Sequence, residues 1–146
     1  MALRTLSRKI ATSDLAERGR EDDPHITVKY GFDDGDDDPG PVRRLLKDFG
    51  PIRVTLGKTS VFPDSGNGDV VKIDVESKDL HRAHNLLNAL PHDESHSEYK
   101  PHATVAYVKA GKGKKYSGLD DLDGQSFTVD VVMFCAKDET KTKVHL

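Results

Sequence analysis

The chain has few of the residues that mark several classes of protein. Its 146 residues include no tryptophan, one cysteine and 6% aromatic residues. The single Cys135 excludes an intramolecular disulfide, and its apolar neighbours predict a buried thiol. The most apolar stretch, 129–136, is too short to span a membrane and carries Asp130. Because the N-terminus also lacks the apolar core of a signal peptide, we expect a cytoplasmic protein without a membrane partner.

An excess of positive charge is also missing. The 22 Lys and Arg residues are outnumbered by 25 Asp and Glu residues, which gives a net charge of -3 at pH 7. Proteins that bind duplex nucleic acid are usually basic, so this balance argues against duplex DNA as a partner. A small anionic ligand held in a local pocket remains compatible with it. Hydrophobic residues make up 35% of the chain, which is enough for one core.

The chain does contain a repeated tetrapeptide. Pro-His-x-Thr occurs at 24–27 and again at 101–104, and each copy continues into Val-x-Tyr. A histidine and a threonine two residues apart on a strand project from the same face. Two facing strands would therefore surround one cavity with two imidazoles and two hydroxyls. One copy could arise by chance, but two copies with the same apolar alternation predict a paired catalytic site made of His25, Thr27, His102 and Thr104.

These side chains suit the cleavage of a phosphodiester. One imidazole can take the proton from a ribose 2′-hydroxyl and the other can protonate the departing oxygen, because imidazole titrates near neutral pH. Threonine hydroxyls can stabilise charge on the non-bridging oxygens. Lys29 and Lys100 lie at even offsets from the histidines and are predicted to add positive charge. The sequence does not say which histidine is the base.

The paired motif resembles the signature of the 2H phosphoesterase superfamily, in which two His-x-Thr motifs lie on opposed strands. The resemblance extends from about residue 22 to the end of the chain. It implies that His25 and His102 are catalytic, that Thr27 and Thr104 bind phosphate, and that no metal or other cofactor is needed. It also implies an α+β, bilobal fold in which two antiparallel sheets line a central cleft with helices outside.

Within the superfamily, the run at 99–107 and the compact size are most similar to phage-encoded anti-CBASS nucleases, which degrade cyclic oligonucleotide signals of bacterial immunity. This similarity implies a cyclic di- or trinucleotide substrate, cleaved at its 3′–5′ phosphodiesters in the cytoplasm of the host cell. Two alternatives stay open. One is a 2′,3′-cyclic phosphodiesterase that processes RNA ends, and the other is a non-catalytic nucleotide-binding sponge. The oligomeric state and the base preference also stay open.

Further substrate contacts are predicted outside the motifs. Tyr99 and Tyr116 are candidates for stacking on a base, and Glu139, together with Lys137, for reading a base edge. The basic loop at 109–115 directly follows the second motif and is placed to close over a polyanion.

Two patterns that suggest a metal are set aside. His92 and His96 are four residues apart, but the glutamate between them is not adjacent to the first histidine as a zinc protease requires. The acidic run at 33–38 leads to Pro39 where a calcium loop needs glycine, and to Leu45 where it needs its last glutamate. We therefore expect no metal site.

Apolar spacing predicts the remaining elements. A helix is expected over 3–18, so that residues 1–20 form an N-terminal helix ahead of one domain at 21–146. Ser77 is predicted to cap a later helix. The full prediction comprises helices at 42–49 and 78–90 and strands at 25–30, 52–56, 59–62, 70–75, 102–108, 127–136 and 143–146.

Overall fold

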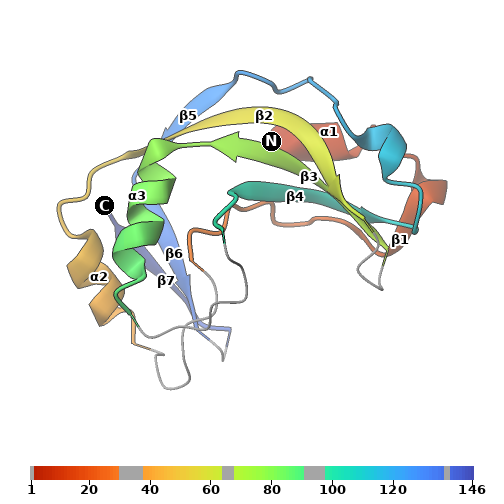
Figure 1. The fold of residues 1–146 in the computed structure, drawn as a ribbon. Coiled ribbons are helices and arrows are strands. Elements are labelled where there is room, and N and C mark those ends of the chain that lie inside the picture. Colours follow the sequence, from red (N-terminus) through yellow and green to blue (C-terminus); the bar gives the residue numbers. More distant parts are fainter. Residues whose placement is uncertain (1, 30–37, 64–67, 91–97, 137–138) are drawn as a thin grey trace. The chain divides into compact units, whose positions relative to one another are not determined.

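The computed structural model describes residues 2–29, 38–63, 68–90, 98–136 and 139–146, and it divides into two compact units (Figure 1). Unit 1 combines Met1–Thr27, Thr55–Glu76 and Lys100–Gln125. Unit 2 combines Val28–Val54, Ser77–Tyr99 and Ser126–Leu146. Helices and antiparallel sheets occur together in the chain, so the predicted α+β class is confirmed.

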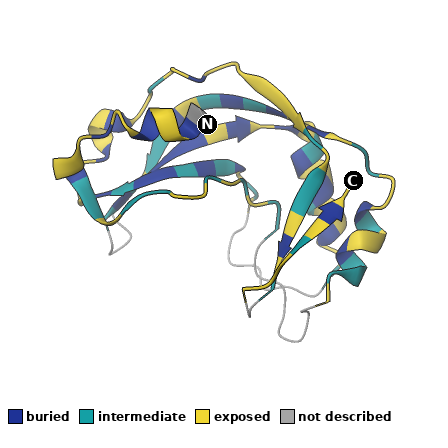
Figure 2. Cartoon of the chain, turned by 180° about the vertical axis from the view of Figure 1, so that it is seen from behind, coloured by how far each residue is buried: buried dark blue, intermediate teal, exposed yellow. Residues whose placement is uncertain are grey.

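A five-stranded sheet with the order β1-β4-β3-β2-β5 carries most of the core. Its strands are β1 (Leu15–Arg20), β2 (Ile52–Phe62), β3 (Asp69–Glu76), β4 (His102–Val108) and β5 (Ser126–Val129). The central strands β3 and β4 are antiparallel and mostly buried, as the dark blue ribbon of Figure 2 shows. Val71, Ile73 and Val105 are at most 2% exposed. The predicted strand at 102–108 is confirmed over its whole length.

The hairpin of β2 and β3 contains an irregularity at Gly57, between the two strands predicted at 52–56 and 59–62. The register of the pair shifts between Leu56 and Thr59, so the two predicted strands at 52–56 and 59–62 are one continuous strand. A Cβ on Gly57 would lie 3.3 Å from the carbonyl oxygen of Asp74 on β3. The bulge therefore depends on close approach of the two backbones, which a glycine permits.

The N-terminal segment belongs to unit 1, and the predicted helix over 3–18 is wrong beyond its first turns. Helix α1 is Ala2–Ser7, a 3-10 turn η1 follows at Thr12–Asp14, and β1 then pairs with β4. The apolar spacing explains the difference, because the step from Ile10 to Leu15 is five residues and leaves the helical face. Arg20 on β1 donates to the carbonyl oxygens of Ser7 and Ile10, which ties this strand to the end of α1.

Unit 2 contains α2 (Gly40–Leu46), α3 (Lys78–Leu87) and a two-stranded sheet of β6 (Val131–Cys135) and β7 (Lys141–His145). The predicted cap is confirmed, since Ser77 Oγ accepts a hydrogen bond from the Leu80 backbone nitrogen at 3.0 Å. None of the described helices is long and apolar enough to cross a membrane.

Two expectations for the C-terminal strands are wrong. The strand predicted at 127–136 is divided at Asp130 into β5 and β6, which belong to different sheets. The thiol of Cys135 is exposed instead of buried. The cause is the alternation of β6, which buries Phe134 and leaves Met133 and Cys135 on the solvent side.

A buried carboxylate ties the segment after β4 to the N-terminal turn. The side chain of Asp14 accepts hydrogen bonds from the Tyr116 hydroxyl at 2.5 Å and the Lys115 ammonium at 2.6 Å. These hydrogen bonds lower the pKa of Asp14 below its usual 3.8. The bond from Lys115 has the largest effect, and the bond from Tyr116 the second largest. The preceding part of the basic loop is held as well, because the Asp69 carboxylate accepts from the backbone nitrogens of Gly111 and Gly113.

Replacing Asp14 with asparagine is expected to lower the stability of the protein at neutral pH. Folding lowers the pKa of Asp14, so its carboxylate stabilises the fold fully at a pH above the unfolded-state pKa. This stabilisation is lost as the pH falls through the folded-state pKa. In urea titrations, the free energy of unfolding of Asp14→Asn should therefore be lower than that of the wild type at pH 7, and this difference should be smaller at pH 3. Asp120→Asn, at an exposed position nearby in the chain, serves as the control. A difference that is the same at both pH values would contradict the assignment.

Candidate active site

Both Pro-His-x-Thr motifs lie in unit 1, where one antiparallel bridge between Ile26 and Ala103 joins them. The second motif begins β4, as predicted. The first motif contributes a single bridge residue and no regular strand, so the strand predicted from residue 25 is wrong over the part of it that the structure describes. The backbone nitrogen of Glu21 donates to the carbonyl oxygen of Val105, so the register changes between this contact and the bridge.

The bridge between Ile26 and Ala103 indicates on which face of the sheet each motif side chain lies. Ala103 is fully buried, whereas His25 and Thr27 are exposed and His102 and Thr104 are partly exposed. Side chains alternate along extended backbone, so the residues flanking the bridge share the face opposite to Ala103. In this register Thr27 lies across from His102 and His25 across from Thr104. The two histidines are then diagonal neighbours, at about 7–8 Å between their Cα atoms.

The two imidazoles are held in the same way. Nδ1 of His25 lies 2.8 Å from the carbonyl oxygen of Asp23, and Nδ1 of His102 lies 2.9 Å from that of Lys100. Each carbonyl belongs to the residue two positions before its histidine. Because a carbonyl only accepts, Nδ1 must carry the hydrogen in both rings. Nε2 is therefore the nitrogen of each ring that can take up or give away a proton.

The N-terminal helix supports this arrangement. Arg4 on α1 donates to the carbonyl oxygen of Asp22 at 2.6 Å, and Glu21 is bonded to β4 through its backbone nitrogen. These contacts anchor the segment that supplies the carbonyl of Asp23 to His25. Residues 1–20 thus help to position the first motif.

A polar network on β2 and β3 adjoins the second motif, and the sequence analysis did not identify it. Lys72 pairs with Thr104 across the sheet and Asp74 pairs with His102, so their side chains share the motif face. The Lys72 ammonium bonds to Ser60 Oγ at 2.5 Å and to the Asp74 carboxylate at 2.7 Å. The register of β3 on β4 is needed to find these neighbours, because the strand sequences alone do not give it.

An aromatic ring also touches the second motif. The ring of Phe62, the last residue of β2, meets the imidazole of His102 edge to face, with 5.3 Å between centroids and 84° between planes. Lys72 lies over the same ring, its ammonium 4.6 Å from the centroid. The second motif is therefore bordered by a cation and by an aromatic side chain.

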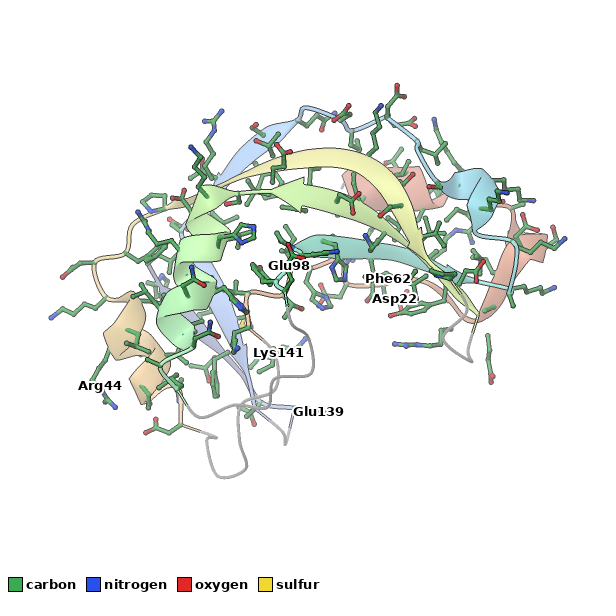
Figure 3. The ribbon with its side chains drawn as sticks, in the orientation of Figure 1. Asp22, Arg44, Phe62, Glu98, Glu139 and Lys141 are labelled. Atoms are coloured by element: carbon green, nitrogen blue, oxygen red, sulfur yellow. The ribbon has the colours of Figure 1, made fainter. Side chains whose placement is uncertain are left out.

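The other predicted contacts have different surroundings. Lys29 donates to Asn88 Oδ1 in unit 2, and Tyr99 stacks on His84 with 4.1 Å between parallel rings. Burial raises the pKa of the Tyr99 hydroxyl well above its ordinary value. Lys100 is exposed and contributes its carbonyl to His102. Glu139 is exposed in the turn between β6 and β7 (Figure 3). The substrate contacts expected of these four side chains stay predictions.

The structure corrects the role expected of Tyr116. Its ring is only 8% exposed, and its hydroxyl donates to Asp14 and accepts from the backbone nitrogen of Ala11. A ring buried in this way cannot stack on a base, so Tyr116 is a core residue of unit 1.

Several candidates of the sequence analysis lie outside the described residues. These are His92, His96, Lys137 and most of the acidic run at 33–38. Within the ranges that the structure does describe, no group of three or more His, Cys, Asp or Glu side chains could hold a metal ion.

Comparison of the sequence with known proteins identifies a family. Residues 2–140 match the family described as the 2′-5′ RNA ligase superfamily. The chain is 31% identical over 113 residues to "Putative phosphoesterase SH1944" of Staphylococcus haemolyticus (strain JCSC1435), an alignment that covers 74% of this chain. The chain spans 63% of the length of that relative.

A solved structure supports the fold independently. The crystal structure of TT0787 of Thermus thermophilus superposes with a TM-score of 0.64 at 18% identity, over 99% of this chain and 87% of the other. At this identity the likeness concerns the fold alone. The match to the family description, in contrast, extends over nearly the whole sequence and includes both motifs. The chain therefore belongs to the 2′-5′ RNA ligase superfamily.

Proposed function

We propose that this protein is a phosphodiesterase that acts on ribonucleotides without a metal ion and uses His25 and His102 as an acid–base pair. The observation that carries the proposal is the matched bond from each Nδ1 to a backbone carbonyl, which leaves Nε2 of both rings as the proton-exchanging atom. The family and the relative named a phosphoesterase support the same type of reaction.

The two rings complete one displacement at phosphorus. The neutral imidazole accepts the proton of the ribose 2′-hydroxyl through Nε2, and the 2′ oxygen attacks phosphorus. The imidazolium donates its Nε2 proton to the 5′ oxygen as the bond from phosphorus to that oxygen breaks. The products are a 2′,3′-cyclic phosphate and a 5′-hydroxyl. The rings have then exchanged protonation states, so water can open the cyclic phosphate by the reverse roles.

The two threonines stabilise the charge that develops during this step. Thr27 lies across from His102 and Thr104 across from His25 in the bridge register. Each hydroxyl can therefore donate to a non-bridging oxygen of a phosphoryl group placed between the rings. Donors fixed in this way act on the transition state more than on the ground state.

The substrate we propose first is a cyclic di- or trinucleotide of the kind used as a bacterial immune signal, cleaved in the cytoplasm. The similarity of the run at 99–107 to anti-CBASS nucleases supports it, as does the absence of an overall positive charge. A second candidate is a 2′,3′-cyclic phosphate at an RNA end, which the description of the family favours. The nucleophile is the ribose 2′-hydroxyl for the first candidate and water for the second, and in both reactions one histidine acts as base and the other as acid.

A substrate panel in the presence of EDTA tests the proposal. We expect the purified protein to convert cyclic dinucleotides and trinucleotides to linear products at an unchanged rate when EDTA is added, with products separated by chromatography. Adenosine 2′,3′-cyclic phosphate and an RNA ending in a 2′,3′-cyclic phosphate test the second candidate in the same assay. Activity that is lost in EDTA and restored by a divalent cation would contradict the mechanism. Tight binding without turnover would identify a nucleotide sponge instead.

A further inference from the structure

Phe62 is an exposed aromatic ring in contact with a motif histidine. It is 42% exposed, although burial of a phenylalanine side chain is favourable. Its ring nonetheless stays at the surface of unit 1 (Figure 3). It lies nearly perpendicular to the His102 ring, with 5.3 Å between centroids. The exposed apolar surface is therefore located beside the position proposed for the scissile phosphate.

The ring is held in place by a buried cation. Lys72 is 9% exposed, and its ammonium lies 4.6 Å from the centroid of the Phe62 ring. Ser60 Oγ and the Asp74 carboxylate fix this ammonium at 2.5 and 2.7 Å. The cation lies over the ring, and the plane of the His102 imidazole is nearly perpendicular to it. With both contacts in place, Phe62 is still 42% exposed to solvent.

We propose that Phe62 is the stacking platform for a nucleobase of the substrate. The proposal rests on the function proposed above, since it places the base next to the phosphate that His25 and His102 cleave. The ligand is a nucleoside carrying a ribose phosphate, because the phosphate meets the motif side chains while the base meets an apolar ring. Stacking is tolerant of base identity, so Phe62 contributes affinity for a base without selecting one.

A purely structural role for Phe62 would have a different signature. If the ring only fixed the orientation of His102, its removal would lower kcat by the same factor for every substrate. If it stacks on a base, its removal raises KM and does so only for substrates that have a base. Base stacking on an aromatic side chain corresponds to about a 5- to 150-fold change in affinity.

The experiment compares two small substrates. One is adenosine 2′,3′-cyclic phosphate, and the other is methyl β-ribofuranoside 2′,3′-cyclic phosphate, which has a methoxy group in place of the base. We expect Phe62→Ala to raise KM about 5- to 150-fold for the first and to leave that of the second unchanged. Phe62→Trp should restore KM. The control is Phe127→Ala on β5, because Phe127 is exposed to the same 42%.

The outcomes separate the inference from the proposed function. An equal loss with both substrates would overturn the stacking role and leave the phosphodiesterase in place. If the wild type hydrolyses neither substrate, calorimetric titration with adenosine 3′-monophosphate and with ribose 3-phosphate decides. A weaker Kd of Phe62→Ala for the nucleotide alone supports the platform. An unchanged Kd for the nucleotide overturns it.

Discussion

Replacing either motif histidine with alanine is expected to lower kcat by about 10²–10⁴-fold, the usual contribution of one acid–base group. The reason is that Nε2 of each ring is the only atom of that side chain able to exchange a proton once Nδ1 is bonded to a carbonyl. Rates of His25→Ala and His102→Ala should be measured with the best substrate of the panel. The kcat of the double variant should be little lower than that of the less active single variant, because the two rings act in one step.

Two controls accompany these variants. His145→Ala changes an exposed histidine on β7, outside the unit that holds the motifs, and should retain full kcat. The pH dependence of kcat/KM in the wild type should be bell-shaped, because one ring must be neutral while the other is protonated. A profile with a single limb between pH 5 and 9 would contradict an acid–base pair. Retention of kcat within about threefold in either single variant would contradict the direct role of that ring.

The faces of the two motifs could be predicted because alternation is a local property of extended backbone. Parity alone assigned His102 and Thr104 to one side of β4 and Ala103 to the other, as the burial of Ala103 bears out. The bonds from Nδ1 of each histidine to a carbonyl two residues earlier could not be predicted. They depend on how the backbone turns before each motif, which the residue types do not specify.

The errors of the sequence analysis concern contacts between distant segments. The residues around Tyr116 have the composition of a loop, but Tyr116 is buried. Its hydroxyl donates a hydrogen bond to Asp14, 102 positions earlier. Leu15 was placed on a helix, although pairing with Val108 on β4 makes it the start of a strand. In both cases tertiary pairing outweighed a local preference, which single-sequence patterns cannot reveal.

Phe62 and Lys72 illustrate a further limit. Their parity on β2 and β3 is readable from the sequence, but their neighbours are not. Two register shifts, one between Leu56 and Thr59 and the other next to Lys72, decide which residues stand opposite the second motif. A shift of one residue would move Lys72 to the other face of the sheet. The polar network beside His102 is therefore a property of the bulges and needs the structure to be seen.

Substituting Gly68 with alanine is expected to destabilise the protein by about 2–5 kcal/mol, the sum of backbone strain and a steric clash. Gly68 precedes β3 with a φ of +104°, and a Cβ there would lie 2.2 Å from the carbonyl oxygen of Val108. Backbone atoms cannot yield as a flexible side chain does. The end of β4 would have to move away from β3, and with it the pairing of Asp69 with Val108.

Gly50→Ala separates the clash from the strain. Gly50 also has a positive φ, of +87°, but a Cβ there would meet nothing within 4 Å. We expect this control to cost only the strain of the left-handed backbone, about 1–2 kcal/mol. Both free energies of unfolding can be measured by urea titration. An equal loss in the two variants would mean that β3 and β4 are not as close at Val108 as described. The register that sets Lys72 against Thr104 and Asp74 against His102 would then be in question, because the same pair of strands defines it.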